Sequence, residues 1–335
     1  MKNVLYIGNV LSNKGKTVTS IEVLGNFLSG LYHVKTASNK SNKILRLLDM
    51  TMLVLNNKNK TDYVLIDTYS TANFYYALII AQICKWFNIK YIPILRGGDL
   101  ESRLIKNPKM SQAIFKYAYK LIAPSSFLKT IFNKYGYSDI TFIPNTIEIN
   151  RYKFKNREID TIKLLWVRSF AELYNPKMAV LVLKQLIEKG YKTQLTMVGP
   201  DNDGTLSKVK HLAEENNVKV NFTGKLSKKD WLALSEKSNI FINTTNFDNT
   251  PVSVIEAMAL GLPVVSTNVG GLPNLIIDKK EGILVPPTNV EEMVDQIINL
   301  KKDKKLKDSM VINARKKVEQ FDWEVVKPKW EALLS

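Results

Sequence analysis

The sequence has 335 residues, which is enough for two domains of ordinary size, each with its own buried core. Its 45% of hydrophobic and 24% of charged residues exclude a chain that is disordered throughout, and its single cysteine, Cys84, excludes an internal disulfide. The histidines are only His33 and His211, so a His/Cys metal site is not expected, whereas a net charge of +17 favours an anionic partner.

In the first half, short runs of β-branched residues alternate with helical patterns. Buried parallel strands are predicted at residues 4–7, 63–66, 91–95, 121–123 and 141–143. Helices are predicted between them, for example over residues 17–31, 71–87 and 125–135. The longest apolar stretch, residues 74–87, is shorter than the ~20 residues that cross a bilayer, and residues 1–8 are too short for a signal peptide. We therefore expect a cytoplasmic protein.

The segment GNVLSNKGKT, residues 8–17, lies between a predicted strand and a predicted helix, as the phosphate-binding loop of P-loop NTPases does. Val10 stands where that motif requires glycine, however, and Asp67 is the nearest candidate for the acid that would hold magnesium. An NTPase is therefore the less favoured interpretation.

Polar residues follow the strand predicted at 91–95, namely Arg96, Gly97, Gly98 and Asp99. Ligands of open parallel sheets bind at the carboxyl ends of strands. Arg96 is therefore a candidate to bind an anionic acceptor or a phosphate, and Asp99 is a candidate acid of the same cleft. The alternative is a structural Gly-Gly turn with an Asp–Arg ion pair.

The alternation starts again after Asn156. Strands are predicted at residues 163–167, 194–198, 220–222, 240–242 and 264–266, and helices are predicted to begin at Pro176, Thr205, Lys228 and Val252. Residues 311–334 are also predicted to be helical. The repeated strand–helix pattern predicts an α/β fold of two Rossmann-like doubly wound domains that face each other across a ligand-binding cleft. The polar segment 148–161, which has no apolar period, marks the boundary.

Residues 241–271 carry the most specific chemistry. A strand is followed by a polar loop, and Thr250 is predicted to be the N-cap of a helix whose first residue is Pro251. The free amides of Val252 and Ser253 and the positive end of the helix dipole then suit a nucleotide diphosphate.

Two acids flank this helix start. Asp248 lies just before it, and Glu256 lies about one and a half turns into it. The two carboxylates can therefore lie on either side of bound phosphates, where one accepts hydrogen bonds from the transferred sugar and the other from the ribose. The alternative is an N-capping loop followed by a solvated helix acid.

This segment resembles the nucleotide-sugar signature of the retaining glycosyltransferases of family 4, which have the two-domain B-type (GT-B) fold. The signature consists of two acids separated by seven residues, then EAMA, a GLPVV strand and a GG loop. The sequence has Asp248, Glu256, EAMALGLPVV and VGG at residues 269–271. The resemblance implies that Asp248, where the family usually has glutamate, touches the donor sugar, and that Glu256 holds the ribose.

A second segment supports the resemblance, which spans residues 142–330. LLWVRSF, residues 164–170, resembles the strand whose last arginine binds the donor diphosphate, and this implies that role for Arg168. The family's lysine five residues later is replaced by Leu173. The nearest candidate is Lys177, for which the alternative is an exposed lysine in the first turn of a helix.

Two glycines and three shorter motifs complete the resemblance. Gly199 in MVGP matches a turn where the backbone approaches the base or ribose, and Gly15 matches the family's flexible glycine-rich loop. FIPNTIEINRY, EGILVPP and FDWEVV match the segment before the interdomain linker, the end of the signature and the start of the final helix. The expected donor-binding residues are Gly15, Arg168, Lys177, Gly199, Asp248, Asn249, Thr250, Pro251, Val252, Ser253 and Glu256, of which Arg168, Asp248 and Glu256 are the expected catalytic residues. The acceptor or cleft candidates are Lys14, Lys16, Arg96, Gly97, Gly98 and Asp99.

The resemblance implies a retaining, metal-independent transferase without a cofactor. It moves a sugar from a UDP- or GDP-linked donor to a glycan or lipid-linked acceptor in cell-surface polysaccharide synthesis. Residues 1–155 then bind the acceptor, residues 156–318 bind the nucleotide-sugar, and residues 319–335 form a helix that returns to the first domain. A non-catalytic nucleotide-sugar-binding or glycan-binding protein of the same fold is the alternative.

The positive charge is concentrated in the first half. Residues 1–160 hold 23 Lys/Arg against 10 Asp/Glu, whereas the rest of the chain holds 25 against 21. The excess favours an anionic acceptor or the inner face of a membrane as a partner of the first domain; the alternative is a lysine-rich surface that only keeps the chain soluble. Nucleic acid is not expected, because the basic residues are scattered and form no known binding module.

Overall fold

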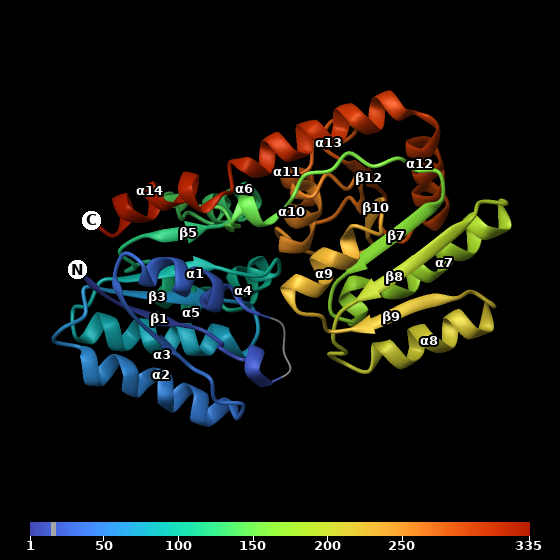
Figure 1. The fold of residues 1–335 in the computed structure, drawn as a ribbon. Helices are drawn as coiled ribbons and strands as arrows, with labels where there is room; N and C mark the ends of the chain where they lie inside the picture. Colours follow the sequence, from blue (N-terminus) through green and yellow to red (C-terminus); the bar gives the residue numbers. More distant parts are fainter. Residues whose placement is uncertain (15–17) are drawn as a thin grey trace. The chain divides into compact units, whose positions relative to one another are not determined.

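The computed structural model describes residues 1–14 and 18–335, and the chain divides into two compact units (Figure 1). Unit 1 comprises Met1–Thr146 and Val326–Ser335, and unit 2 comprises Ile147–Val325. None of the helices in the described ranges combines the length and apolar character needed to span a bilayer.

Unit 1 is built on a six-stranded parallel sheet with the strand order β2-β1-β3-β4-β5-β6. Every residue of β3 is buried, as expected for an inner strand of a parallel sheet with both faces covered. The strands are β1 (Asn3–Ile7), β2 (His33–Ala37), β3 (Tyr63–Thr68), β4 (Tyr91–Leu95), β5 (Leu121–Ala123) and β6 (Ile140–Phe142). The helices are η1 (Ser12–Lys14), α1 (Ser20–Ser29), α2 (Lys43–Asn57), α3 (Ala72–Trp86), α4 (Leu100–Lys106), α5 (Pro108–Phe115) and α6 (Ser126–Lys134).

Unit 2 is built on a second six-stranded parallel sheet, with the order β12-β11-β10-β7-β8-β9. Helix α13 packs against α10 within this unit. The strands are β7 (Ile162–Val167), β8 (Thr193–Val198), β9 (Val220–Gly224), β10 (Ile240–Asn243), β11 (Val264–Thr267) and β12 (Ile283–Val285). The helices are η2 (Ile149–Arg151), η3 (Glu172–Tyr174), α7 (Pro176–Glu188), α8 (Thr205–Glu215), α9 (Lys228–Ser235), α10 (Val252–Ala259), α11 (Leu272–Leu275), α12 (Val290–Lys302) and α13 (Lys304–Glu319).

The chain returns to unit 1 within the last helix, α14 (Trp323–Leu333), because residues from Val326 on belong to that unit. There Trp330 is buried, and the Tyr63 hydroxyl donates to the Ser335 carbonyl at 2.9 Å. The contact-defined border lies between Thr146 and Ile147, upstream of the predicted boundary after residue 155. Backbone hydrogen bonds of 3.0 Å and 2.9 Å tie Ile147 to the segment before α14.

The two doubly wound α/β units confirm the predicted fold class, and the differences lie at edges and helix ends. The sequence analysis missed the two edge strands β2 and β12. The helix predicted over 311–334 is two helices, because the chain turns between Glu319 and Trp323 to pair with Ile147. Helix α1 begins at Ser20, where Thr19 and Glu22 form a capping box; the predicted start at Thr17 lies outside the described residues.

Candidate active site

The strand order of unit 2 reverses between β7 and β10, since β8 and β9 continue on one side and β11 and β12 on the other. At such a point, the loops that follow the two neighbouring strands diverge and leave a crevice at the carboxyl edge of the sheet. Arg168 follows β7 directly, and Asp248 lies in the loop after β10. The topology therefore brings these two predicted donor-binding side chains to the same edge.

Arg168 and Asp248 form an ion pair, and their side chains are 17% and 16% exposed. The Arg168 guanidinium also lies 4.3 Å from the centre of the Tyr174 ring. Burial lowers the pKa of Arg168 and Tyr174 counteracts this shift; because an ordinary arginine pKa is above about 12, the side chain remains a cation. Within the described chain, its buried Nε has no hydrogen-bond partner, so the cation keeps one donor for a ligand.

The loop that carries Asp248 is fastened to the segment after β7. The indole nitrogen of Trp166 donates to the Thr244 hydroxyl at 3.0 Å, and that hydroxyl donates to the Tyr174 carbonyl at 3.0 Å. On the other side, the Gly271 amide donates to the Asp248 carbonyl at 2.9 Å. Both members of the ion pair are thus held by neighbours that are themselves attached to buried strands.

Two glycines permit close backbone contacts around the ion pair. A Cβ at Gly199 would overlap the Arg168 carbonyl, and a Cβ at Gly270 would overlap the Asp248 carbonyl. Both glycines have positive φ angles, 154° and 55°, which side-chain-bearing residues rarely adopt. Gly199 therefore has a structural role in addition to its predicted approach to the base or ribose, which stays a prediction.

Helix α10 begins one residue later than predicted. Pro251, with φ −66° and ψ 121°, occupies the N-cap position. The prediction that Thr250 is the cap is wrong, since the extended ψ of Pro251 makes its own carbonyl the first helical acceptor, 3.1 Å from the Val254 amide. The Thr250 hydroxyl instead lies 3.4 Å from the side-chain oxygen of the buried Asn249.

The first turn of α10 presents donors without helical partners. The amides of Val252 and Ser253 precede the first amide that has a helical carbonyl partner, and the buried Ser253 hydroxyl has no partner among the described residues. At the other end of the helix, Arg315 donates to the Ala259 carbonyl at 2.7 Å and Arg157 to the Leu260 carbonyl at 2.5 Å. With cations at its C-terminus and free donors at its N-terminus, α10 suits an anion at its N-terminus.

Glu256 is buried in α10 between two side chains that the sequence analysis missed. The Tyr152 hydroxyl donates to Glu256 Oε1 at 2.8 Å, and Lys228 Nζ forms an ion pair with the same oxygen. Burial and the Glu256 charge raise the pKa of Tyr152. Arg315 holds Tyr152 in place by donating to its carbonyl at 2.8 Å. The alternative of a solvated helix acid is therefore wrong for Glu256, because burial and two partners fix its carboxylate.

Lys177 lies in the first turn of α7, where its amine is 3.7 Å from Glu172 and its side chain is 40% exposed. Glu172 also accepts a hydrogen bond from Lys208 at 3.0 Å. This surface pairing agrees with the alternative that Lys177 is an exposed lysine of the first helical turn.

In unit 1, Arg96 is engaged in the interior. Its guanidinium donates to Asp67 at 2.9 Å, to Asn145 Oδ1 at 2.6 Å and to the Tyr6 hydroxyl at 3.3 Å, and Tyr6 donates to Asp67 at 2.9 Å. The Arg96 and Asp67 side chains are 8% and 1% exposed. Burial and the neighbouring Asp67 raise the pKa of Tyr6. The geometry favours the structural alternative for Arg96, with Asp67 rather than Asp99 as its partner.

The other candidates of unit 1 lie nearer the surface. Asp99 is exposed at the N-cap of α4 and accepts from a serine hydroxyl of that helix at 2.9 Å, and residues 97–98 are half-buried. Lys14 is exposed at the end of η1, while Gly15 and Lys16 lie outside the described residues. Among residues 1–14 and 18–335, no three His, Cys, Asp or Glu side chains lie close enough together to hold a metal ion.

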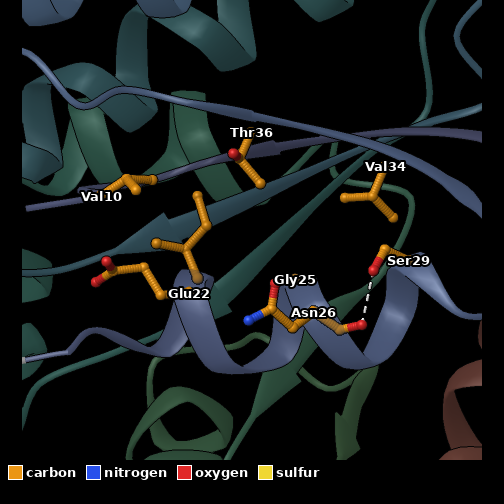
Figure 2. A pocket seen from close by; sticks show the side chains of 8 residues that line it. Val10, Glu22, Gly25, Asn26, Ser29, Val34 and Thr36 are labelled. Atoms are coloured by element: carbon orange, nitrogen blue, oxygen red, sulfur yellow. Dashed lines mark hydrogen bonds between the residues drawn. The ribbon is translucent and has the colours of Figure 1, made fainter. Parts of the chain in front are cut away.

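Unit 1 also contains a pocket of about 340 Å³ between helix α1 and strand β2 (Figure 2). Asn26 and Ser29 of α1 and Val34 and Thr36 of β2 contribute to its lining. Glu22, its charged side chain among the described residues, already accepts hydrogen bonds from the Thr19 amide at 2.9 Å and hydroxyl at 2.8 Å. The pocket therefore does not offer the cationic and amide donors that gather in unit 2.

Residues 148–317, half of the chain, match the family described as glycosyl transferases group 1. The chain belongs to this family. A similar protein is an uncharacterized glycosyltransferase of Methanocaldococcus jannaschii, 25% identical over 71% of this chain and 66% of its own length. Another is CapM of Staphylococcus aureus, a capsular polysaccharide biosynthesis glycosyltransferase, 27% identical over 45% of this chain and 39% of its own length. The chain thus spans less than two thirds of these curated relatives.

Among solved structures, the chain is similar to that of HepE from Anabaena in complex with UDP-glucose. The TM-score is 0.82 at 16% identity, and the match covers 100% of this chain and 99% of that one. This likeness confirms that the group 1 glycosyl transferase described above has the expected B-type fold.

Proposed function

We propose that this group 1 glycosyl transferase is a retaining enzyme of family 4. It transfers a sugar from a UDP-sugar to a glycan or lipid-linked acceptor in cell-surface polysaccharide synthesis. The observation that carries the proposal is the set of donors in unit 2 that await an acceptor: the Nε of Arg168, the Ser253 hydroxyl and the first amides of α10. A diphosphate supplies the oxygens that such donors bind. The UDP-glucose in HepE and the polysaccharide pathway named for CapM support the choice of base and of acceptor class.

In the proposed reaction, the bond between the anomeric carbon and the diphosphate breaks, the acceptor oxygen bonds to that carbon, and the leaving phosphate takes the acceptor proton. Negative charge grows on the leaving phosphate, where Arg168 and the α10 amides stabilise it with preorganised donors. Asp248 pairs with Arg168 in the free protein. When the phosphate replaces this partner, the Asp248 carboxylate is released to accept hydrogen bonds from the donor sugar.

Glu256 is the proposed ribose-binding acid. Its carboxylate is fixed by Tyr152 and Lys228, so it meets the ribose hydroxyls without a further loss of side-chain freedom. Because Arg168 and α10 supply the positive charge, the proposed enzyme uses no metal and no cofactor. Addition of EDTA is expected to leave the rate of UDP release unchanged; a loss that only added Mg²⁺ or Mn²⁺ restores would contradict this part.

The decisive experiment incubates the protein with a panel of UDP- and GDP-sugars, with and without membrane-derived glycan acceptors, and measures the released nucleotide. We expect UDP release that depends on the acceptor, with the anomeric configuration of the donor retained in the product by NMR. Tight UDP binding without turnover on any donor would instead establish the non-catalytic alternative.

A pair of serine variants tests the orphan donor. Ser253→Ala is expected to weaken UDP binding by about 3- to 10-fold, because a hydroxyl–phosphate hydrogen bond is lost. Ser207→Ala, in the first turn of α8 of the same unit, is the matched control, since its hydroxyl already donates to the Gly204 carbonyl at 2.9 Å. Equal UDP affinity of the two variants would count against a diphosphate at α10.

A further inference from the structure

Helix α2 of unit 1 is apolar on two opposite faces. On its inner face, Met50 and Val54 are buried in the core of the unit, and Leu47 and Leu53 pack against that core. On its outer face, Ile44, Leu45, Leu48 and Met52 are between 51% and 71% exposed. These four residues, which we call the α2 face, fall within an arc of about 100° on a helix of 3.6 residues per turn.

The outward side of an ordinary surface helix is polar. Helix α12 of unit 2 follows this rule: its exposed residues are Glu291, Asp295, Asn299 and Lys302. The α2 face has no such charged residue, and its four large side chains leave an apolar surface of the kind that marks an interaction site.

Exposed aromatic residues lie beside the C-terminal end of α2. Helices α2 and α3 pack side by side (Figure 1), and α3 ends in Trp86, which is 84% exposed and stacks on Phe87 with ring centres 6.0 Å apart. The Lys58 amine, at the C-cap of α2, lies 4.2 Å from the centre of the Phe87 ring. Tryptophan next to lysine is the composition found where a protein meets the boundary between lipid tails and headgroups.

The surroundings of α2 are strongly basic. Residues 35–60 contain six Lys/Arg and a single acid, Asp49, whose carboxylate accepts from Ser38 at 2.5 Å. Lys58 also lines a pocket of about 290 Å³ together with Lys2 and Lys90. Unit 1 as a whole has 21 Lys/Arg against 8 Asp/Glu, whereas unit 2 has 27 against 23.

We propose that the α2 face, with Trp86 and Phe87, lies flat on an anionic lipid bilayer. The apolar side chains enter the boundary of the acyl region, and the flanking lysines contact lipid phosphates. A second copy of the chain fits this surface less well, because two units with the same excess of positive charge would repel each other. The inference is independent of the donor site in unit 2 and would stand if the proposed reaction were wrong.

The test is flotation of the full chain with vesicles of equimolar phosphatidylglycerol and phosphatidylcholine, and with vesicles of phosphatidylcholine alone. We expect binding to the anionic vesicles that falls steeply at about 1 M salt, where the Debye length is about 3 Å. The variant Leu45→Gln/Leu48→Gln/Met52→Gln replaces exposed residues by good helix formers and is expected to lower the partition coefficient more than about tenfold. Lys43→Gln and Lys58→Gln are each expected to lower it about fivefold on anionic vesicles.

The matched control is Ile187→Gln/Ile312→Gln, which changes two apolar residues of unit 2 that are each 44% exposed. It is expected to bind vesicles like the parent chain. UDP binding, measured in solution, is expected to be the same for all these variants and shows that each one is folded.

A spectroscopic readout places the contact. Anionic vesicles are expected to shift the tryptophan emission of the parent chain to shorter wavelength, and Trp86→Phe is expected to abolish this shift. Unchanged vesicle binding by the triple glutamine variant would overturn the proposal. So would a dimer in sedimentation that the same variant converts to a monomer while the parent chain ignores vesicles; that outcome would assign the α2 face to a second copy.

Discussion

Each unit pairs an arginine with an aspartate at the carboxyl edge of its sheet, and the two pairs differ in how complete they are. In unit 1, the Arg96 guanidinium donates to Asp67, Asn145 and Tyr6, and the ion pair is almost fully buried. In unit 2, the Arg168 and Asp248 side chains remain about one sixth exposed, and the Nε of Arg168 has no partner among the described residues.

The difference separates a structural ion pair from one that is ready for a ligand. A buried pair whose hydrogen bonds are all made gains nothing from an added anion, whereas a pair with an orphaned donor and an open side can exchange its aspartate for a phosphate. The four substitutions below test whether this distinction holds.

The largest effect is expected from Arg96→Met. The change leaves Asp67 buried without its cation, and we expect the free energy of unfolding of unit 1 to fall by about 3–5 kcal/mol. Urea denaturation followed by circular dichroism measures this. The comparison would fail if Arg168→Met, which leaves the more exposed Asp248 unpaired, destabilised the protein as strongly.

For Arg168→Met, the expected loss is in catalysis. Removing one preorganised donor from a developing oxyanion lowers kcat by about 10²- to 10³-fold, and the melting temperature should change little. Initial rates of UDP release give kcat, and a thermal melt provides the control. A rate within threefold of the parent chain would remove Arg168 from the proposed donor site.

A smaller effect is expected for Tyr152→Phe, which deletes the 2.8 Å hydrogen bond to Glu256. Loss of one such bond corresponds to about 0.5–1.5 kcal/mol, so we expect KM for the UDP-sugar to rise about 2- to 10-fold with kcat nearly unchanged. Tyr191→Phe, at a half-buried tyrosine of the same unit, is the control. If kcat fell and KM did not, Tyr152 would act in the chemical step and not through the ribose-binding acid.

The smallest signal is expected from Cys84, which lies in the core of unit 1. Burial raises the pKa of this thiol to about 12, so the native protein should not react with a thiol reagent at pH 8. In Arg96→Met the labelling rate should rise, because unit 1 opens more often, whereas in Arg168→Met it should stay at the parent level. Equal rates in both variants would show that the two pairs contribute alike to stability.

The inner strands were predictable because their residues form short apolar runs with few polar interruptions, as in YVLID at the start of β3. The edge strand β2, with the sequence HVKTA, has mostly exposed or half-buried residues and therefore lacks such a run. At the site, the positions of Arg168 and Asp248 after strands followed from the sequence, but their contact did not. Tyr152 and Lys228 could not be found, because they are 104 and 28 residues away from Glu256 and only the fold brings them together.

The close approach of Gly270 to the Asp248 carbonyl has a consequence for how this protein can be engineered or can diverge. The loop after β10 and the turn after β11 fit together without space for a methyl group, so the two segments cannot change independently. A library that randomises residues 248–250 to alter the preferred sugar should therefore retain Gly270, and a screen of all substitutions should tolerate none at that position. Epistasis between these two loops, which are distant in sequence, is expected to limit which donor specificities are reachable by single steps.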